Sequence, residues 1–360
     1  MSTIYNDIGS WTFLKSKFNE NRIFDFLKLE DVLDFQENFY SIKSNYILEQ
    51  ENLLLHEKRS LEIRLGQLVI VIENQRAFKE TEILDRIKYF ENLIGQKQIE
   101  LRSNSIRNII NYMNVCFLYF RLKIIRINKQ NQINRSVKPL ITEYQALEKR
   151  FKFLSNHFSE AVTFEIQPKI NELEKKRNII AEYNTYLIGA IGEQQVVSIL
   201  QRLSDEYYVI NDFQLNFRPA LYWKKENEYI KSIQIDHLLI SPSGIFLIET
   251  KNWSKDSIGN IDLRSPVLQI QRSGYAFYRF VNSKLTNKWK ILLWGSKKIQ
   301  TRNIIAMINS KPNEEFQFVK ILNPSEISGY VQYFGKVLSS QEVISLVGEL
   351  NEYNGAAISL

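Results

Sequence analysis

The sequence has few of the residues that crosslink or interrupt a chain. Its one cysteine, Cys116, excludes a disulfide framework within the chain and favours a reducing compartment, so we expect a cytoplasmic protein. The first residues lack a basic segment followed by an apolar one, so we expect no signal peptide. The absence of a glycine-rich phosphate-binding loop argues against ATP-driven work by this chain.

A long uninterrupted apolar run is also missing. The most apolar stretch, 109–127, contains Asn111, Asn114, Arg121, Lys123 and Arg126. A membrane-spanning helix rarely carries that many polar side chains, so a membrane partner is not expected. The alternative that this basic, apolar segment lies on a membrane surface stays open, since such segments bind lipid interfaces.

Acidic residues are absent from one segment of a chain whose formal net charge is +7. Eight Lys and Arg residues and no Asp or Glu lie between Arg102 and Lys138. Such a segment is suited to docking on nucleic acid or another polyanion. It is equally consistent with a helix surface whose counter-charges come from elsewhere in the fold.

Proline is absent before Pro139, and glycine is sparse over the first 185 residues, which is a helical composition. Apolar residues also recur with helical spacing, which predicts long helices over about 40–78, 80–130 and 139–185, with breaks near 77–81 and in 128–139. Pro168 is expected to kink or restart the third helix. The predicted seams are Ile47, Leu54, Leu61 and Leu68; Ile106, Ile110, Met113, Phe117, Phe120, Ile124 and Ile127; and Leu140, Tyr144, Leu147, Phe151, Leu154, Phe158 and Ala161.

Steps of four and three residues keep a seam facing a partner helix, as in a coiled coil. The partner could lie in the same chain or in a second copy. Because several seam residues are aromatic and bulky, we favour an antiparallel arrangement within one chain. Self-association through its surface would make the protein a homo-oligomer, and an unidentified protein partner is the other possibility.

The composition changes near Tyr186, where short β-like runs alternate with helical patterns. We therefore predict an α+β protein with two parts. Residues 1–185 form an antiparallel long-helix, coiled-coil region, and residues 186–360 form an α/β domain with a central mixed sheet flanked by helices. The predicted strands lie at 207–213, 232–240, 244–250, 302–308 and 315–322, and the predicted helices of this domain at 187–203, 268–280, 324–334 and 340–350.

Three charged residues lie in an apolar hairpin, IQIDHLLISPSGIFLIETKNW, which spans 233–253. Glu249 and Lys251 are two residues apart and share a face of their strand. A register that brings Asp236 beside Glu249 would place two carboxylates and an ammonium together. Such carboxylates repel each other unless a cation lies between them, and their oxygens select Mg²⁺ or Mn²⁺.

A third carboxylate comes from the helical stretch LIGAIGEQQVVSIL, 187–200. Gly189, Gly192 and Glu193 fall on one face of this helix. Two glycines on one face predict a close approach to the sheet, which would press Glu193 toward the carboxylate pair. Helix packing with Glu193 at the rim is the simpler alternative.

These motifs, in this order, resemble the nuclease-related domain, NERD, of the PD-(D/E)xK nuclease superfamily. The residues concerned are G-x-x-G-E, Q-I-D-H, G-I-F-L-I-E-T-K-N-W and P-x-x-Q (Pro266 to Gln269), and the likeness covers about 186–334. The resemblance implies a PD-(D/E)xK-like fold with metal-binding acids at Glu193, Asp236 and Glu249, a catalytic Lys251 and an accessory Gln269. Gln271 with Tyr275 matches the spacing of another branch of the superfamily, so the glutamine assignment has two candidates.

The resemblance further implies a Mg²⁺-dependent phosphodiesterase that acts on nucleic acid, with DNA favoured over RNA. It also implies an association with helicases or with bacterial defence. The alternative is a catalytically inactive nucleic-acid-binding or scaffold protein on the same fold. Two features stay open at this stage: the insertion-like stretch 217–232 is a substrate-contacting hairpin or a decorated edge, and the aromatic, basic run 289–298 is a nucleic-acid contact or a packed segment.

Overall fold

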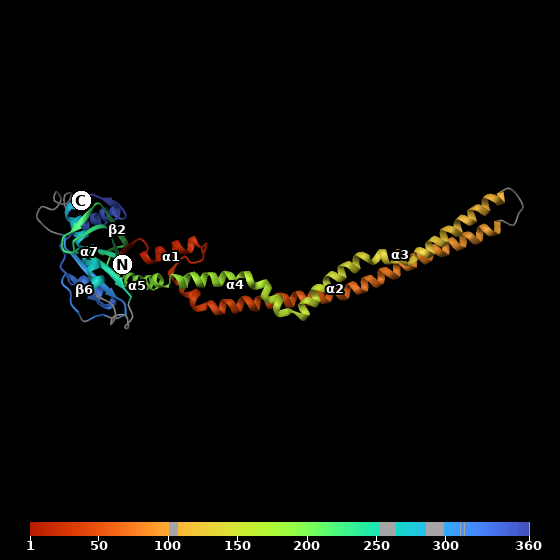
Figure 1. Ribbon diagram of the computed structural model, residues 1–360, viewed down its shortest axis with the longest axis horizontal. Coiled ribbons are helices and arrows are strands. Elements are labelled where there is room, and N and C mark those ends of the chain that lie inside the picture. The colour runs from red at the N-terminus through yellow and green to blue at the C-terminus, as the bar shows by residue number, and fades with distance from the viewer. Residues whose placement is uncertain (101–106, 253–263, 286–298, 310, 313, 360) are drawn as a thin grey trace. The chain divides into compact units, whose positions relative to one another are not determined.

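The computed structural model describes residues 1–100, 107–252, 264–285, 299–309, 311–312 and 314–359, and it divides into two compact units (Figure 1). Unit 1 combines Met1–Glu37 with Glu174–Leu360, and unit 2 is Asn38–Leu173. The α+β class is as predicted, with long helices followed by a mixed sheet. The division differs from the single boundary expected at 185/186, because residues 1–37 fall in unit 1, where β1 pairs with β2 and α1 packs on α5.

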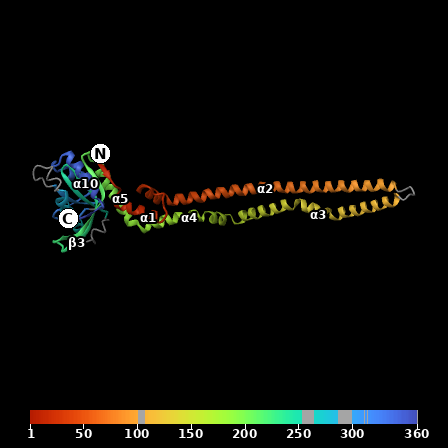
Figure 2. The ribbon, with the colours of Figure 1, turned by 90° about the horizontal axis from the view of Figure 1, so that it is seen from above.

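Unit 2 is built from α2 (Leu29–Glu100), α3 (Arg107–Asn156) and α4 (Phe158–Glu182), of which α2 and α4 continue into unit 1. Figures 1 and 2 show α2 and α3 lying side by side. Ile94 of α2 packs on Val115 of α3, whereas Ile83 packs on Ile133. Contacts that move back along α2 as they advance along α3 show an antiparallel pair, as predicted.

Both predicted breaks in the helical region are wrong. Helix α2 runs without a break through 77–81, a stretch that has no glycine or proline. Within it the Thr81 hydroxyl donates a hydrogen bond to the Ala77 carbonyl (2.9 Å). Helix α3 runs through 128–139 and contains Pro139, because its apolar contacts on both sides of the proline outweigh the lost backbone hydrogen bond. Pro168 likewise lies inside α4.

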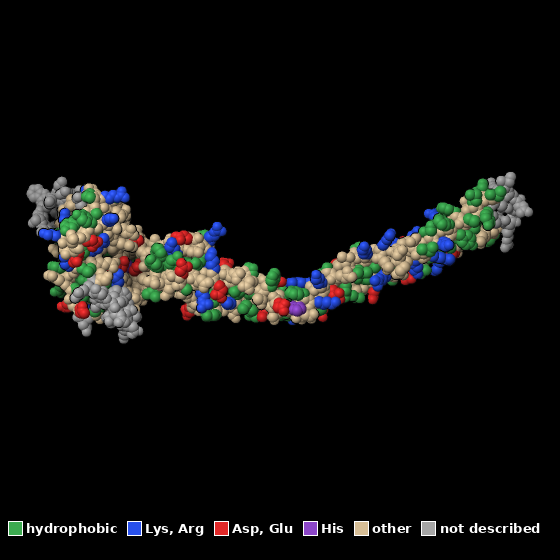
Figure 3. All heavy atoms as spheres, viewed as in Figure 1, with side chains coloured by type: hydrophobic (Ala, Val, Ile, Leu, Met, Phe, Trp, Pro, Cys, Tyr) green, Lys and Arg blue, Asp and Glu red, His purple; other side chains and the backbone are tan. Residues whose placement is uncertain are grey.

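The predicted seam of α3 is also on the wrong face of the helix. Ile110, Met113, Phe117 and Phe120 are each more than half exposed, and Figure 3 shows hydrophobic side chains at the surface of unit 2. The buried face of α3 includes Val115, Leu122, Ile125, Ile133 and Val137. The helix carries two apolar stripes, and the 4-3 spacing alone does not say which stripe meets α2. The seams through Leu54 and Leu154 do face inward.

No helix within the described ranges is apolar over a length that could cross a membrane. Part of the positive charge of α3 is balanced by acids of α2. Arg126 pairs with Glu91, and the Lys129 Nζ lies 2.6 Å from a Glu80 carboxylate oxygen. These pairs support the interpretation that counter-charges for the basic segment come from elsewhere in the fold.

The described strands of unit 1 form one mixed sheet in the order β1-β2-β3-β4-β5-β6, with β7 beside β2. Strands β2, β3 and β4 are antiparallel neighbours, whereas the β1–β2, β2–β7, β4–β5 and β5–β6 pairs are parallel. Their bounds are β1 Thr3–Tyr5, β2 Tyr208–Trp223, β3 Glu228–Ser241, β4 Gly244–Lys251, β5 Thr301–Met307, β6 Val319–Leu322 and β7 Ala357–Ile358.

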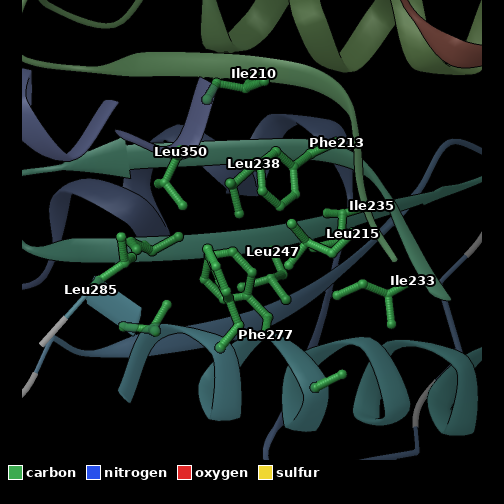
Figure 4. Close-up of a cluster of buried hydrophobic side chains, with 14 of the residues drawn as sticks. Ile210, Phe213, Leu215, Ile233, Ile235, Leu238, Leu247, Phe277, Leu285 and Leu350 are labelled. Atoms are coloured by element: carbon green, nitrogen blue, oxygen red, sulfur yellow. The ribbon is translucent and has the colours of Figure 1, made fainter. Parts of the chain in front are cut away.

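Helices cover both faces of the sheet, as predicted. Helices α7 (Arg264–Phe280) and α10 (Ser340–Tyr353) cover one face, and α5 (Asn184–Leu200) and α9 (Pro324–Gln332) cover the other. Figure 4 shows Phe277 of α7 beneath the strands that carry Leu238 and Leu247, and its ring centre lies 5.8 Å from that of Phe213. Helix α1 (Gly9–Glu20) packs on α5.

The predicted strands are confirmed in type and order, and two of them are longer than expected. The stretch 217–232 extends β2 and β3 into a long hairpin, and contact of this hairpin with a substrate stays a prediction. The sequence analysis missed β1 and β7, which have only three and two residues. Strands this short carry little periodicity and depend on their partner β2.

Candidate active site

The β3–β4 hairpin brings Asp236 to Glu249. In the observed register Leu238 lies opposite Leu247 and His237 opposite Ile248, so the next pair along is Asp236 and Glu249. The backbone N–H of Thr250 donates to Asp236 Oδ2 at 2.7 Å, which ties the carboxylate to β4. The structure therefore joins the two acids in the way that the hairpin sequence predicts.

Glu249, Lys251 and Gln269 form a connected group on the α7 side of the sheet. Lys251 Nζ donates to Glu249 Oε1 (2.8 Å) and to Gln269 Oε1 (3.2 Å), while Gln269 Nε2 donates to the same Glu249 oxygen (2.7 Å). The Glu249 side chain is 6 % exposed and that of Lys251 is 20 % exposed. The lysine head group is therefore held in place at the edge of solvent.

Of the two candidate glutamines, the structure brings Gln269 to the acids. Gln271, two residues further along α7, accepts from Lys225 Nζ (2.9 Å) and donates to the Gln317 carbonyl (3.2 Å). Residues two apart on a helix point in different directions, so only one of the pair can reach Glu249.

Glu193 lies in α5, and the two glycines of its face are close to their neighbours. A Cβ at Gly192 would come within 3.2–3.4 Å of Ile308, Asn252 and Thr250, so α5 approaches the ends of β4 and β5 as expected. A Cβ at Gly189 would lie 2.9 Å from the Ser10 hydroxyl, so this glycine makes room for the N-terminal segment and not for the sheet.

Ser10 holds both carboxylate oxygens of Glu193. Its backbone N–H donates to Oε2 at 3.3 Å, and its hydroxyl donates to Oε1. Burial raises the pKa of Glu193, the Ser10 hydrogen bonds oppose that rise, and the nearby Asp212 and Glu249 carboxylates add to it. Glu193 is thus close enough to the other acids to feel their charge, while its oxygens face α1.

The alternation of faces in β3 breaks beside Asp236. Ile233 and Ile235 pack in the same core cluster as Leu238, so the break lies between Ile235 and Leu238. Opposite this break, Asp212 of β2 has a left-handed backbone (φ 49°), while the pairing register of the two strands continues unshifted from Asn211 to Phe213.

Asp236 has the most perturbed carboxyl group of the site. Its pKa lies well above the ordinary value because burial disfavours the charged form and because the Glu249 and Glu193 carboxylates repel it. The Thr250 N–H and the Lys251 ammonium act in the opposite direction but do not cancel these effects. The site therefore has an excess of negative charge that a cation would relieve.

The donor set fits a hard divalent ion, since it consists of carboxylate oxygens and an amide oxygen. Within the described ranges, however, no group of three or more His, Cys, Asp or Glu side chains is arranged to hold a metal. Glu193, the third predicted ligand, instead accepts hydrogen bonds from Ser10 on both of its carboxylate oxygens.

His237, beside Asp236 in the sequence, is packed on the opposite face and is completely buried. Its Nδ1 lies 2.8 Å from Asn211 Oδ1, and burial lowers its pKa to about 3. A histidine that stays neutral in this way has a structural role and does not join the acids.

Two residues of the site were missed by the sequence analysis. Ser10 lies 183 positions before Glu193, and nothing in its local sequence marks it as a contact of that residue. Asp212 had a usable signal, because Asn211-Asp212 interrupts an apolar strand with two residues that disfavour β structure. Trp253 of the hairpin motif and the run 289–298 lie outside the described residues.

The family model described as nuclease-related domain, NERD, matches residues 188–302. This stretch contains Glu193, Asp236, Glu249, Lys251 and Gln269, so the resemblance given by the sequence motifs is confirmed for it. No curated protein matches the chain. No solved structure matches it either. The match indicates a nuclease-related function for unit 1.

Proposed function

We propose that unit 1 is a metal-dependent nuclease that hydrolyses phosphodiester bonds in nucleic acid, with DNA as the favoured substrate. The observation that carries the proposal is the group of Asp236 within β3, Glu249 and Lys251 at the end of β4, and Gln269 on α7. Its carboxylates crowd one another, and its lysine is held at the edge of solvent.

Each residue has a distinct part in the proposed reaction. In hydrolysis a water oxygen attacks phosphorus, a P–O bond breaks, and negative charge builds up on the phosphate oxygens. Lys251, fixed by Glu249 and Gln269, donates a hydrogen bond to the attacked phosphate or to the water, which offsets that charge. Gln269 fixes the orientation of Glu249 through its amide N–H.

Asp236 and Glu249 would hold Mg²⁺ or Mn²⁺, and Glu193 would serve as a third ligand only if its hydrogen bonds to Ser10 were released. The raised pKa of Asp236 supports this assignment, because burial and the Glu249 and Glu193 carboxylates disfavour its charged form, and a bound cation would offset that cost. The ion supplies a more acidic bound water and neutralises phosphate oxygens.

The test is incubation of plasmid with the full chain in the presence of Mg²⁺ or EDTA. We expect cleavage with Mg²⁺ and none with EDTA. Lys251→Ala and Asp236→Ala should each lower the rate by about 10²–10³-fold, the usual effect of losing a group that stabilises transition-state charge. Lys336→Ala is the matched control, because Lys336 pairs with Glu206 outside the site. Cleavage that survives both substitutions would refute the site assignment.

A second candidate function is nucleic-acid binding by a catalytically inactive unit 1. The observation that favours it is the engagement of both Glu193 oxygens by Ser10. In that case Mg²⁺ should leave the thermal stability of the protein unchanged, and no substrate form should be cut. A Mg²⁺-dependent rise in melting temperature that Asp236→Ala removes would exclude this candidate.

For unit 2 we propose self-association through the exposed apolar stripe of α3 that contains Ile110, Met113, Phe117, Phe120 and Ile127. Exposed apolar stripes of this length are typical of helix–helix interfaces. Analytical ultracentrifugation should show an oligomer that Phe117→Ser with Phe120→Ser dissociates. A monomer at all concentrations would exclude the proposal. Docking of the basic segment 102–138 on nucleic acid, an unidentified protein partner and a role in bacterial defence stay predictions.

A further inference from the structure

A second concave surface of unit 1 lies at the edge of the sheet, around the start of β6. It is a cavity of about 910 Å³ between the end of β2, α7, the start of β5, the segment 316–320 and the end of α9. Seven of its fifteen lining residues are aromatic and three are Lys or Arg, and the lining has no Asp or Glu. Aromatic rings beside cations are the composition of surfaces that bind unpaired bases and their phosphates.

Phe318 is the most unusual residue of this cavity. Its side chain is 78 % exposed, although a phenylalanine gains free energy by burial. Its backbone is left-handed (φ 62°), a conformation that bulky side chains rarely adopt. The chain thus carries two unfavourable features at one position, an exposed aromatic ring and a left-handed backbone. Strain of this kind is concentrated at functional sites.

Three neighbours hold Phe318 in this conformation. Asn303 Nδ2 donates to the Phe318 carbonyl (3.2 Å), and Gln271 Nε2 donates to the Gln317 carbonyl (3.2 Å). Gly274 of α7 is required for the first of these contacts, because a Cβ there would lie 2.5 Å from Asn303 Oδ1. Helix α7 and strand β5 are therefore built to fix the segment that displays the ring.

Other rings stand beside Phe318 in the same cavity. Trp223 and Tyr275 are stacked, with ring centres 6.0 Å apart and planes 21° apart. The Tyr275 hydroxyl donates to the Tyr222 carbonyl (3.1 Å), which anchors the β2–β3 hairpin to α7. Tyr278, one turn further along α7, is 43 % exposed. The long hairpin formed by 217–232 thus supplies part of an aromatic wall.

The charges of the cavity are those that phosphates require. Lys320 is exposed, Lys225 Nζ lies 5.9 Å from the Trp223 ring centre, and the Arg302 guanidinium lies 3.8 Å from that of Phe334. Glu226, outside the lining, lies 3.5 Å from Lys225 and offsets only that cation. Helix α7 contributes to both the cavity and the candidate active site, and its residues Gln269 and Tyr278 are about 14 Å apart along the helix axis.

We propose that this cavity binds the unpaired bases of a single-stranded nucleic acid, with Phe318 as a stacking platform and the three cations on the backbone phosphates. The proposal rests on the nuclease function proposed above and names the form of substrate that the same unit holds. A strand bound here and passing along α7 reaches Gln269 and Lys251. Single-stranded ends, flaps or unpaired regions are then preferred over intact duplex.

The test is the fluorescence anisotropy of a labelled oligothymidylate, measured with the full chain in EDTA so that no cleavage occurs. We expect Phe318→Ala to weaken binding about tenfold, the usual loss on removing one stacked ring. Phe318→Tyr should bind as the wild type does. Phe318→Asn keeps a residue that tolerates the left-handed backbone but removes the ring, so it should lose as much as alanine.

Phe24→Ala is the matched control, because Phe24 is also an exposed aromatic residue of unit 1 (64 %) but does not line the cavity. Equal binding by all Phe318 variants, or an equal loss in Phe24→Ala, would overturn the proposal. So would duplex DNA that competes as well as the single strand, or free thymidine monophosphate that competes at the same concentration. Because binding is measured without metal, failure here leaves the Lys251→Ala cleavage test intact, and failure of cleavage leaves the Phe318 result interpretable.

Discussion

Units 1 and 2 use apolar side chains in different ways. In unit 1 the strands bury apolar residues on both faces of the sheet, and the few buried charged side chains, such as Glu193 and Glu249, lie in the candidate site. In unit 2 the helices bury about one apolar residue per two turns, and most of the exposed large apolar residues among those that the structure describes lie there. A buried charge is therefore informative in unit 1, whereas an apolar repeat is ambiguous in unit 2.

The two units also differ in how their apolar clusters connect the parts of the chain. The core of unit 1 joins β2, β3, β4, α7 and α10, which are distant in sequence, so its parts depend on one another. The clusters of unit 2 are small and follow one another along the helix pair. Such an arrangement unfolds locally, while a shared core unfolds as one body.

The largest effect is expected from truncating the shared core. Phe277→Ala should lower the free energy of unfolding of unit 1 by about 3–5 kcal/mol, because Phe277 is completely buried among Phe213, Phe280 and Leu247. Leu154→Ala, at an equally buried position of unit 2, should leave unit 1 unchanged. Hydrogen exchange read peptide by peptide separates the units. Equal loss of protection in both units by either variant would contradict the comparison.

A second effect concerns the stability of the fold in acid. His237 should make the stability of unit 1, but not that of unit 2, fall as the pH is lowered. The pKa of His237 is lowered to about 3, so the unfolded chain binds a proton below about pH 6.5 that the folded chain does not. Stability from this group is full above pH 6.5 and falls by about 1.4 kcal/mol per pH unit below it, down to pH 3. Denaturant unfolding at pH 7 and pH 5 measures the change.

His237→Gln should flatten that pH dependence in unit 1. The control is His157→Gln in unit 2, whose ring is about half exposed and should have no such effect on unit 1. The same slope in wild type and His237→Gln would show that another group controls acid unfolding.

A third effect tests whether the charge of Asp236 destabilises unit 1 when no metal is bound. Because the pKa of Asp236 is raised, its stabilising contribution is full below about pH 3.8 and is lost as the pH rises through the raised value. Asp236→Asn should therefore stabilise metal-free unit 1 at pH 8, because it removes a charge that burial and the neighbouring carboxylates disfavour. Asp205→Asn, at an exposed position, is the control.

Added Mg²⁺ sharpens this third test. The wild type should gain thermal stability with Mg²⁺, and Asp236→Asn should not, because it has lost a charged ligand. A variant that is less stable than the wild type at pH 8 without metal would contradict the account of Asp236.

The part of the site that could be predicted from the sequence is the part that local geometry controls. The turn after Ser241 sets the hairpin register, and the two-residue period of β4 puts Glu249 and Lys251 on one face. Those two facts bring Asp236 to Glu249. Gly192 likewise predicts the close approach of α5 to the ends of β4 and β5. The catalytic roles of these residues stay a prediction, since geometry alone does not measure a reaction.

The features that could not be predicted depend on partners far away in the chain. Ser10 meets Glu193 only because β1 pairs with β2 and α1 packs on α5. The seam of α3 was misplaced because Ile110 and Val115 belong to two stripes of similar spacing, and only the position of α2 selects between them. Pro139 alone predicts a helix boundary, but α3 continues through it because the tertiary contacts of the helix override the local effect of the proline.

The smallest effect is expected from the charged contacts of unit 2. Arg150 donates to Glu57 (2.8 and 2.9 Å) and to Glu165 (2.8 Å), which links α2, α3 and α4. The Arg150 hydrogen bonds lower the pKa of Glu57, so this contribution is present above pH 4.5 and is lost as the pH falls. More than a third of the Glu57 side chain is exposed, and water and salt screen such pairs.

We therefore expect Glu57→Gln to cost only about 0.5 kcal/mol in unit 2, and less in high salt. Local hydrogen exchange at the α2–α3 contact measures it, with Glu148→Gln as a control for an ion pair within α3. A loss of several kcal/mol in the free energy of unfolding that does not depend on salt would contradict this expectation. It would mean that ion pairs shielded from water, and not the small apolar clusters, hold these helices together. The stability of both units would then depend on a few ionic groups, and the units would differ only in where those groups lie.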